Sequence, residues 1–244
     1  MTDAGNLTSG RGGGRASAAE VAQFDALAEG WWDLRGPMAA LHAMNPVRVG
    51  WIDGQLARGS RVLDVGCGAG IAAEALAKLG HLVVGVDAAP GVIAAARAHA
   101  ADTGMPVAYR VGVTGGLLAE GARFDAVCAL EVIEHVPDPA GFLRDLAGLG
   151  RPGGMVFVST VNRTMRSLVM AKIGAEYVAR LLPVGTHDWR RFVTPGELRR
   201  DGQAAGLRLV GCVGMVFDVV RWRWAVSKDL AINYVAAFKV EASP

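Results

Sequence analysis

Short runs of apolar and β-branched residues recur along the chain from Arg61 onward, and helical segments separate them. Alternation of this kind is typical of βαβ units, which build a parallel sheet. The predicted strands are Arg61–Asp64, Leu82–Val86, Val107–Val111, Phe124–Leu130, Met155–Thr160, Leu207–Met215 and Ile232–Val240. The early strands are almost entirely apolar, as expected when helices cover both faces of a sheet. The pattern predicts an α/β fold with a doubly wound, mostly parallel sheet of seven strands.

Helices are predicted between these strands and ahead of them. The helices that accompany the strands are Ile71–Leu79, Pro90–Ala101, Ala140–Leu146 and Thr194–Ala205. Ahead of the first strand, Ala18–Leu34 and Met38–Ala57 have helical periodicity and predict an N-terminal helical layer. Trp31 and Trp32 end the first of these segments, and we interpret them as packing residues.

A long insertion interrupts the rhythm between the fifth strand and Thr194, over residues 161–193. Insertions at the carboxyl edge of such sheets are often lids or binding elements. Residues 166–182 predict an amphipathic helix, which fits either a lid or an element that lies on a membrane surface. His187 and Asp188 follow it, either to close over the site or to cap the next segment.

Composition narrows the class of protein. Of the 244 residues, 52% are hydrophobic and 20% are charged, which is enough for a substantial core. The net charge of +2 is too small to indicate a nucleic-acid partner. Three scattered cysteines give no disulfide framework and no thiolate zinc site. We expect a disordered tail over 1–17, one domain over 18–244, and a cytoplasmic protein that at most attaches to the inner face of a membrane.

A glycine loop follows the first strand. Asp64 ends the strand, and Gly66, Gly68 and Gly70 form a G-x-G-x-G turn into a helix. This spacing differs from the G-x-G-x-x-G that binds a dinucleotide pyrophosphate. It suits an adenosyl sulfonium, whose amino-acid end Asp64 can face, while Asp87 at the end of the second strand can accept hydrogen bonds from both ribose hydroxyls. A structural turn and an NAD(H) enzyme are the alternatives.

An acidic and histidine cluster follows the fourth strand. On a helical turn, Glu131, Glu134 and His135 would face one way, because they lie at positions i, i+3 and i+4. Two carboxylates and an imidazole can hold a divalent metal, which would lower the pKa of a bound phenol. Two alternatives stay open: His135 acting alone as a general base, and a purely structural cluster.

The glycine loop and the strand that ends at Asp87 resemble the S-adenosylmethionine (SAM) motif of class I methyltransferases, which have a Rossmann-like fold. The segments that narrow the resemblance are Trp31-Trp32-Asp33, Asn45-Pro46-Val47-Arg48, Ser159-Thr160-Val161-Asn162-Arg163, Gly185-Thr186-His187-Asp188-Trp189 and Ile232-Asn233-Tyr234. In this order, over about residues 21–240, the chain resembles the UbiG-type O-methyltransferases of ubiquinone biosynthesis.

The resemblance implies SAM-dependent O-methylation of polyprenylated catechol or demethylubiquinol-type intermediates. It implies a lipid-tailed quinone precursor as partner, with association with a membrane surface or a biosynthetic complex. It also implies that Arg48, Gly66, Asp87 and Leu130 line the SAM pocket. The same resemblance implies that Glu131, Glu134 and His135 hold a divalent metal, expected to be Mg²⁺.

The segment Phe217-Asp218-Val219 departs from the family pattern on the substrate side. This departure leaves open a methyltransferase for another small phenol or acid. A separate alternative, from a different class, is a non-catalytic SAM-binding subunit of a biosynthetic complex.

Overall fold

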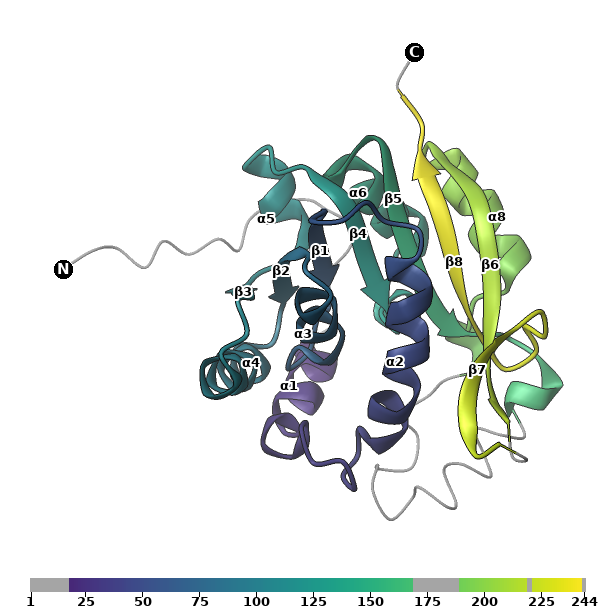
Figure 1. The fold of residues 1–244 in the computed structure, drawn as a ribbon. Coiled ribbons are helices and arrows are strands. Elements are labelled where there is room, and N and C mark those ends of the chain that lie inside the picture. The colour runs from purple at the N-terminus through teal and green to yellow at the C-terminus, as the bar shows by residue number, and fades with distance from the viewer. Residues whose placement is uncertain (1–17, 169–188, 219–220, 243–244) are drawn as a thin grey trace.

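The computed structural model describes residues 18–168, 189–218 and 221–242. These residues form one eight-stranded sheet with the strand order β3-β2-β1-β4-β5-β8-β6-β7 (Figure 1). The strands are β1 (Arg61–Val65), β2 (Leu82–Asp87), β3 (Ala108–Val111), β4 (Phe124–Leu130), β5 (Gly150–Val161), β6 (Leu207–Asp218), β7 (Arg223–Ser227) and β8 (Asn233–Val240). The five strands from β3 to β5 are parallel, and β8 pairs antiparallel with both β5 and β6.

The prediction of a doubly wound, mostly parallel sheet is confirmed, and the predicted count of seven strands was one too low. The additional strand is β7, which forms an antiparallel hairpin with β6. The alternation of Arg221, Trp222, Arg223 and Trp224 indicates such a hairpin, because every second residue faces the same side of a strand. Strand β6 continues to Asp218, three residues past the predicted end at Met215, in order to pair with it.

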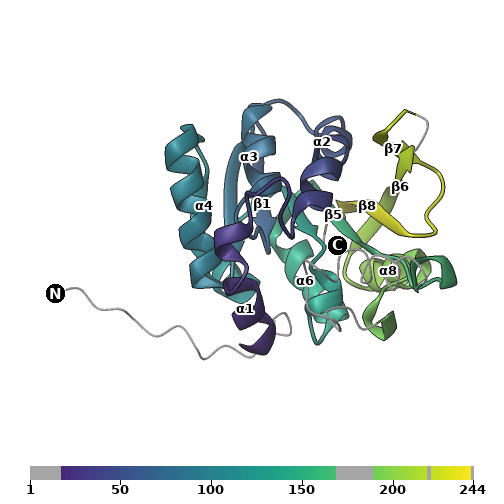
Figure 2. The same ribbon diagram turned by 90° about the horizontal axis from the view of Figure 1, so that it is seen from below.

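Helices cover both faces of the sheet. They are α1 (Ala18–Asp25), α2 (Ala39–Asp53), α3 (Ile71–Lys78), α4 (Pro90–Thr103), α5 (Thr114–Ala119), α6 (Pro139–Leu149) and α8 (Pro195–Ala204), with short 3-10 helices η1 (Ala28–Gly30), η2 (Ile133–His135) and η3 (Trp189–Arg191). Helices α2 to α4 lie on one face, whereas α5, α6 and α8 lie on the other, and α1 lies at the carboxyl edge of the sheet (Figures 1 and 2). The sequence did not predict α5, since Gly115 and Gly116 are poor helix formers.

The N-terminal segment is not the single helix that the periodicity predicted over Ala18–Leu34. Helix α1 ends at Asp25, and η1 and a series of turns follow. The reason lies in Trp31 and Trp32, which both face the glycine loop. Adjacent residues of an α-helix point about 100° apart, so a continuous helix would not bring both rings onto that loop.

Two large hydrophobic clusters lie one on each face of the sheet, and a small third cluster consists of Met44, Met215 and Val235. Neighbouring residues of β1 show the division, because Val62 belongs to the cluster under α2 to α4 and Leu63 to the cluster under α5, α6 and α8. Strand β1 pairs with β2 on one side and β4 on the other. The order in which successive strands are added to the sheet therefore reverses between β1 and β4. In doubly wound sheets, ligands bind in the crevice at the carboxyl ends of such strands.

Some predicted features lie outside the described residues. They are the tail over 1–17, most of the 161–193 insertion with its amphipathic helix, and His187 and Asp188. Residues 165–168 are helical where the described chain stops. Within the described ranges, no helix is long and apolar enough to cross a membrane.

Candidate active site

The glycine loop lies between β1 and α3 and folds onto the end of β2. The backbone N–H groups of Gly66 and Cys67 both donate to the carbonyl of Val86, at 2.8 and 3.1 Å. Gly68 has φ +55, and an added Cβ would lie 2.3 Å from a ring carbon of Trp31. Gly70 has φ +95, and its Cβ would lie 2.0 Å from the Tyr109 hydroxyl. The loop therefore requires glycine for both its backbone conformation and its close packing.

Asp87 ends β2 beside this loop. One carboxylate oxygen accepts from the backbone N–H of Gly68 at 3.0 Å, and the other accepts from Ala89 at 2.9 Å. Burial raises the pKa of Asp87, and these backbone donors oppose the rise. A carboxylate offers about four lone-pair positions, so each oxygen keeps capacity for one further donor, such as a ribose hydroxyl.

Arg48 and Asp64 lie buried behind the loop, at 3% and 2% exposure. Helix α2 carries Arg48, whose Nη2 donates to Asn45 Oδ1 at 3.3 Å. The Nε and Nη1 atoms of Arg48 and the Oδ2 atom of Asp64 have no hydrogen-bond partner. Burial raises the pKa of Asp64 to about 7, and the charge of Arg48 opposes the rise. Buried polar atoms are nearly always hydrogen-bonded, so these atoms indicate a place for a ligand.

Glu131 follows the last residue of β4, Leu130, which is buried. Its φ of +58 lies in the left-handed region, which is uncommon for a residue with a side chain. Ser159 on β5 stabilises this conformation: the Glu131 N–H donates to the Ser159 carbonyl at 3.0 Å, and the Ser159 hydroxyl donates to Glu131 Oε1 at 2.7 Å. The same Oε1 lies 3.7 Å from Arg48 Nη1. Strain of this kind is concentrated at functional sites.

Glu134 points into the protein and is 5% exposed. Its Oε2 accepts from the Thr160 hydroxyl at 3.0 Å, and its side chain also hydrogen-bonds to Glu131. Burial, and then the charge of Glu131, raise the pKa of Glu134 well above its usual range. Glu134 is therefore protonated near neutral pH and hydrogen-bonded to Glu131.

His135 is half-buried at the end of η2. Its ring lies edge-on to the ring of Phe24, with centroids 5.5 Å apart and an interplanar angle of 87°. The helical turn on which Glu131, Glu134 and His135 were predicted to face one way is not formed. Glu131 lies outside the helical turn in a left-handed conformation, and only Ile133–His135 form a 3-10 turn. Among the described residues, no three His, Cys, Asp or Glu side chains are grouped to hold a metal ion.

The structure brings all seven predicted SAM residues to the carboxyl ends of β1, β2 and β4: Arg48, Asp64, Gly66, Gly68, Gly70, Asp87 and Leu130. Sequence reasoning assigned no role to Ser159 and Thr160. The available signal was a pair of hydroxyl residues at the carboxyl end of an otherwise apolar strand. It also interpreted Trp31 only as packing, whereas the ring lies directly on the glycine loop.

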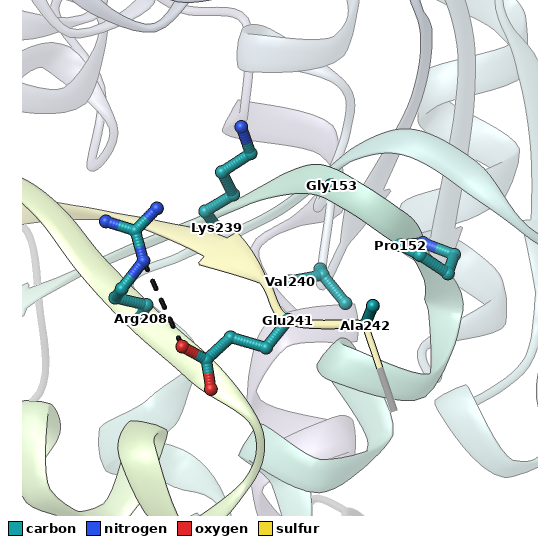
Figure 3. Close-up of a pocket in the computed structure, with 7 residues that line it drawn as sticks. All are labelled: Pro152, Gly153, Arg208, Lys239, Val240, Glu241 and Ala242. Atoms are coloured by element: carbon teal, nitrogen blue, oxygen red, sulfur yellow. Dashed lines mark ion pairs between the residues drawn. The ribbon is translucent and has the colours of Figure 1, made fainter. Parts of the chain in front are cut away.

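A second hollow, of about 590 Å³, lies at the opposite edge of the sheet, where β5 begins and β8 ends (Figure 3). Its lining residues are Pro152, Gly153, Arg208, Lys239, Val240, Glu241 and Ala242. Figure 3 shows Arg208 facing Glu241, and these two form an ion pair at 3.9 Å. This hollow contains none of the site residues, and its charges are partly paired already.

Comparisons with known proteins agree with this site. A family model described as a methyltransferase domain matches residues 47–211. A solved SAM-dependent methyltransferase from Thermotoga maritima superposes with a TM-score of 0.66 at 16% identity, covering 90% of this chain and 99% of that chain. A magnesium protoporphyrin IX methyltransferase from Synechocystis PCC 6803 with bound SAH superposes with a TM-score of 0.60 at 21% identity, covering 83% and 84%. These structural likenesses show the class I methyltransferase fold.

Curated relatives define the family more narrowly. A ubiquinone biosynthesis O-methyltransferase from Azorhizobium caulinodans is 47% identical over 228 residues, which cover 88% of this chain and 90% of the relative. A protein of the same name from Methylobacterium sp. (strain 4-46) is 45% identical over 231 residues, covering 89% and 93%. The chain therefore belongs to the family of SAM-dependent ubiquinone biosynthesis O-methyltransferases.

Proposed function

We propose that this protein transfers the methyl group of SAM to a phenolic hydroxyl of polyprenylated catechol intermediates in ubiquinone biosynthesis. The observation that carries the proposal is the pair of buried, unsatisfied groups on Arg48 and Asp64 beside the glycine loop. SAM ends in an amino acid, with one carboxylate and one ammonium. These two charges complement a buried guanidinium and a buried carboxylate.

Three polar parts of SAM, the carboxylate, the ammonium and the ribose, have a counterpart among the described residues. Arg48 would hold the carboxylate and Asp64 the ammonium, while Asp87 would accept from the ribose hydroxyls. The glycine loop supplies the close backbone approach. SAM itself supplies the reaction with an electrophilic methyl group bound to a positively charged sulfur.

The acceptor must lose its phenolic proton, because the phenolate is the effective nucleophile and an ordinary phenol has a pKa of about 10. We assign this proton transfer to His135, a half-buried imidazole that follows β4 at the same sheet edge. The new bond forms between the phenolic oxygen and the methyl carbon as the carbon–sulfur bond breaks. The proton stays on His135, and the cofactor leaves as the neutral thioether SAH.

The acidic pair has a different role in this proposal. Glu131 approaches Arg48 at 3.7 Å, and Glu134 hydrogen-bonds to Glu131. The pair thereby fixes the guanidinium that binds the SAM carboxylate. Among the described residues these three side chains are not grouped as a metal site, and Glu131 and Glu134 are hydrogen-bonded to each other. We therefore assign no step to a metal, and the Mg²⁺ site remains a prediction to be tested.

We also propose that the protein reaches its lipid-tailed substrate at a membrane surface. Exposed apolar side chains occur where β6 ends and where residues 165–168 begin a helix: Trp222 is 79% exposed and Met165 is 68% exposed. Arg166, Arg221 and Arg223 are exposed beside them. Aromatic and basic side chains are the residues that bind the interface of anionic lipid bilayers. Co-sedimentation with anionic vesicles, compared with neutral vesicles, tests this part of the proposal.

A methyl-transfer assay with catechols of different tail lengths tests the function. We expect SAH to form with a polyprenylated catechol, and His135→Ala to lose most turnover while calorimetry shows unchanged SAM affinity. Turnover only with phenols that lack a polyprenyl tail would indicate the alternative function, a methyltransferase for another small phenol or acid. SAM binding without turnover on any catechol would indicate the non-catalytic subunit.

A further inference from the structure

The N-terminal segment, residues 21–36, contacts the glycine loop, His135 and the start of α4. Helix α1 lies at the carboxyl edge of the sheet beside α4 (Figure 2). Asp25 on this helix accepts from the backbone N–H groups of Gly91 and Val92, at 2.9 and 3.1 Å. It thereby caps α4, whose own N-cap residue, Ala89, forms no side-chain cap. The segment is thus attached to the element that follows Asp87.

A second attachment fixes the other end of the segment. The indole N–H of Trp32 donates to the Ala69 carbonyl at 3.0 Å. Its ring stacks on His99 with centroids 3.4 Å apart and an interplanar angle of 3°. His99 is fixed in turn by Glu74, at 2.8 Å. These contacts hold the N-terminal segment on the glycine loop in a defined position.

Two aromatic rings of this segment, Phe24 and Trp31, form a row from the glycine loop to His135. The Trp31 ring packs on Gly68, closely enough that an added Cβ would clash with it. The Phe24 ring lies 6.2 Å from Trp31 and 5.5 Å from His135, measured between centroids. We call Phe24 and Trp31 the aromatic wall.

The sulfur of SAM has to lie in the space that this wall borders. It joins the amino-acid end, assigned to Arg48 and Asp64, to the ribose, assigned to Asp87. Its methyl group must also face the phenolic oxygen that His135 deprotonates. The wall reaches from the glycine loop to His135. It therefore borders the region between the SAM-binding residues and the phenolic oxygen, where the sulfonium has to lie.

We propose that Phe24 and Trp31 bind the sulfonium of SAM and make the site favour the charged donor over the neutral product SAH. The inference rests on the proposed function for the position of SAM. The face of an aromatic ring carries negative charge density and attracts a cation within about 6 Å of its centroid. SAH keeps the size and nearly all the dispersion contacts of SAM but has lost the positive charge. The wall therefore loses its electrostatic attraction when the methyl group leaves.

The test is a pair of calorimetric titrations, with SAM and with SAH, on the wild type and on variants of Phe24. The quantity is the ratio of the two dissociation constants, Kd(SAH)/Kd(SAM), which cancels contacts common to both ligands. We expect Phe24→Leu to lower this ratio by about 2- to 30-fold, the range of a single cation–π contact. Phe24→Tyr keeps an aromatic face, so its ratio should stay near the wild-type value.

Val21→Ala is the matched control, because Val21 lies on the same helix and packs on the same core without belonging to the wall. It should leave the ratio unchanged. The inference is overturned if Phe24→Leu leaves the ratio unchanged, or if Val21→Ala lowers it equally. Phe24 is only half-buried, so both variants should fold. Absence of SAM binding by the wild type would contradict the proposed function itself. A failure of the proposed function is therefore distinguishable from a failure of the inference about the aromatic wall.

Discussion

Replacing Asp64 with asparagine should raise the stability of the fold and, at the same time, weaken the binding of SAM. Burial raises the pKa of Asp64 from 3.8 to about 7 in the folded protein. A carboxyl group whose pKa is raised in the folded state contributes most to stability below about pH 4, where it is protonated in both states. This contribution is lost as the pH rises through about 7. Near neutral pH, the folded protein therefore bears the free-energy cost of ionising a buried acid.

The magnitude follows from the shift. Each pKa unit corresponds to about 1.36 kcal/mol. Relative to a side chain that is always neutral, Asp64 destabilises the fold by about 4 kcal/mol at about pH 8, where it is ionised in both states, and by about 2 kcal/mol at about pH 5, where it is ionised only in the unfolded chain. Asparagine has the same shape and no charge to bury. We expect Asp64→Asn to be more stable than the wild type, with a difference in unfolding free energy that grows by about 2 kcal/mol between these pH values.

Urea denaturation of both proteins without ligand, at both pH values, measures this difference. Asp102→Asn on the exposed side of α4 is the control, because it removes an equal charge at the surface and should change stability by less than about 0.5 kcal/mol. The same Asp64→Asn variant should bind SAM more weakly, since the ammonium loses its anionic partner. Equal or lower stability of Asp64→Asn at about pH 8 would refute the reasoning.

The remaining predictions concern the loop, the acidic pair and the metal. Gly70→Ala forces a side chain into φ +95 and onto the Tyr109 hydroxyl, so thermal unfolding should show a loss of about 3 kcal/mol or more, and normal stability would contradict the loop geometry. Thr160→Val removes the hydroxyl that donates to Glu134, and denaturation should show a loss of about 1–2 kcal/mol. If Mg²⁺ has no catalytic role, stripping divalent metal should leave turnover unchanged, whereas restoration of lost turnover by Mg²⁺ alone would support the metal prediction.

The sheet, the glycine loop and the position of Asp87 were predictable because each depends on a local pattern. The strand from Phe124 to Leu130 is bounded as predicted, since a fully apolar run between turns has few other structures available. Gly66, Gly68 and Gly70 required only their spacing and the strand before them. Asp87 followed from its position at the end of the next strand.

The acidic pair and the aromatic wall depend on contacts distant in sequence, which a local pattern does not contain. Glu131 takes a left-handed conformation because Ser159, 28 residues away, binds both its N–H and its carboxylate. A helical spacing rule therefore predicted a turn that is not formed. Phe24 meets His135 only because α1 packs at the carboxyl edge of the sheet, and its own periodicity indicated a core position.

Calorimetric titration of the wild type and of Asp87→Ala with SAM, and separately with NAD(H), tests the central claim most directly. The site predicts one SAM per chain for the wild type, much weaker binding for Asp87→Ala, and no uptake of the dinucleotide. Binding of NAD(H) with indifference to SAM would contradict the assignment of the glycine loop and Asp87.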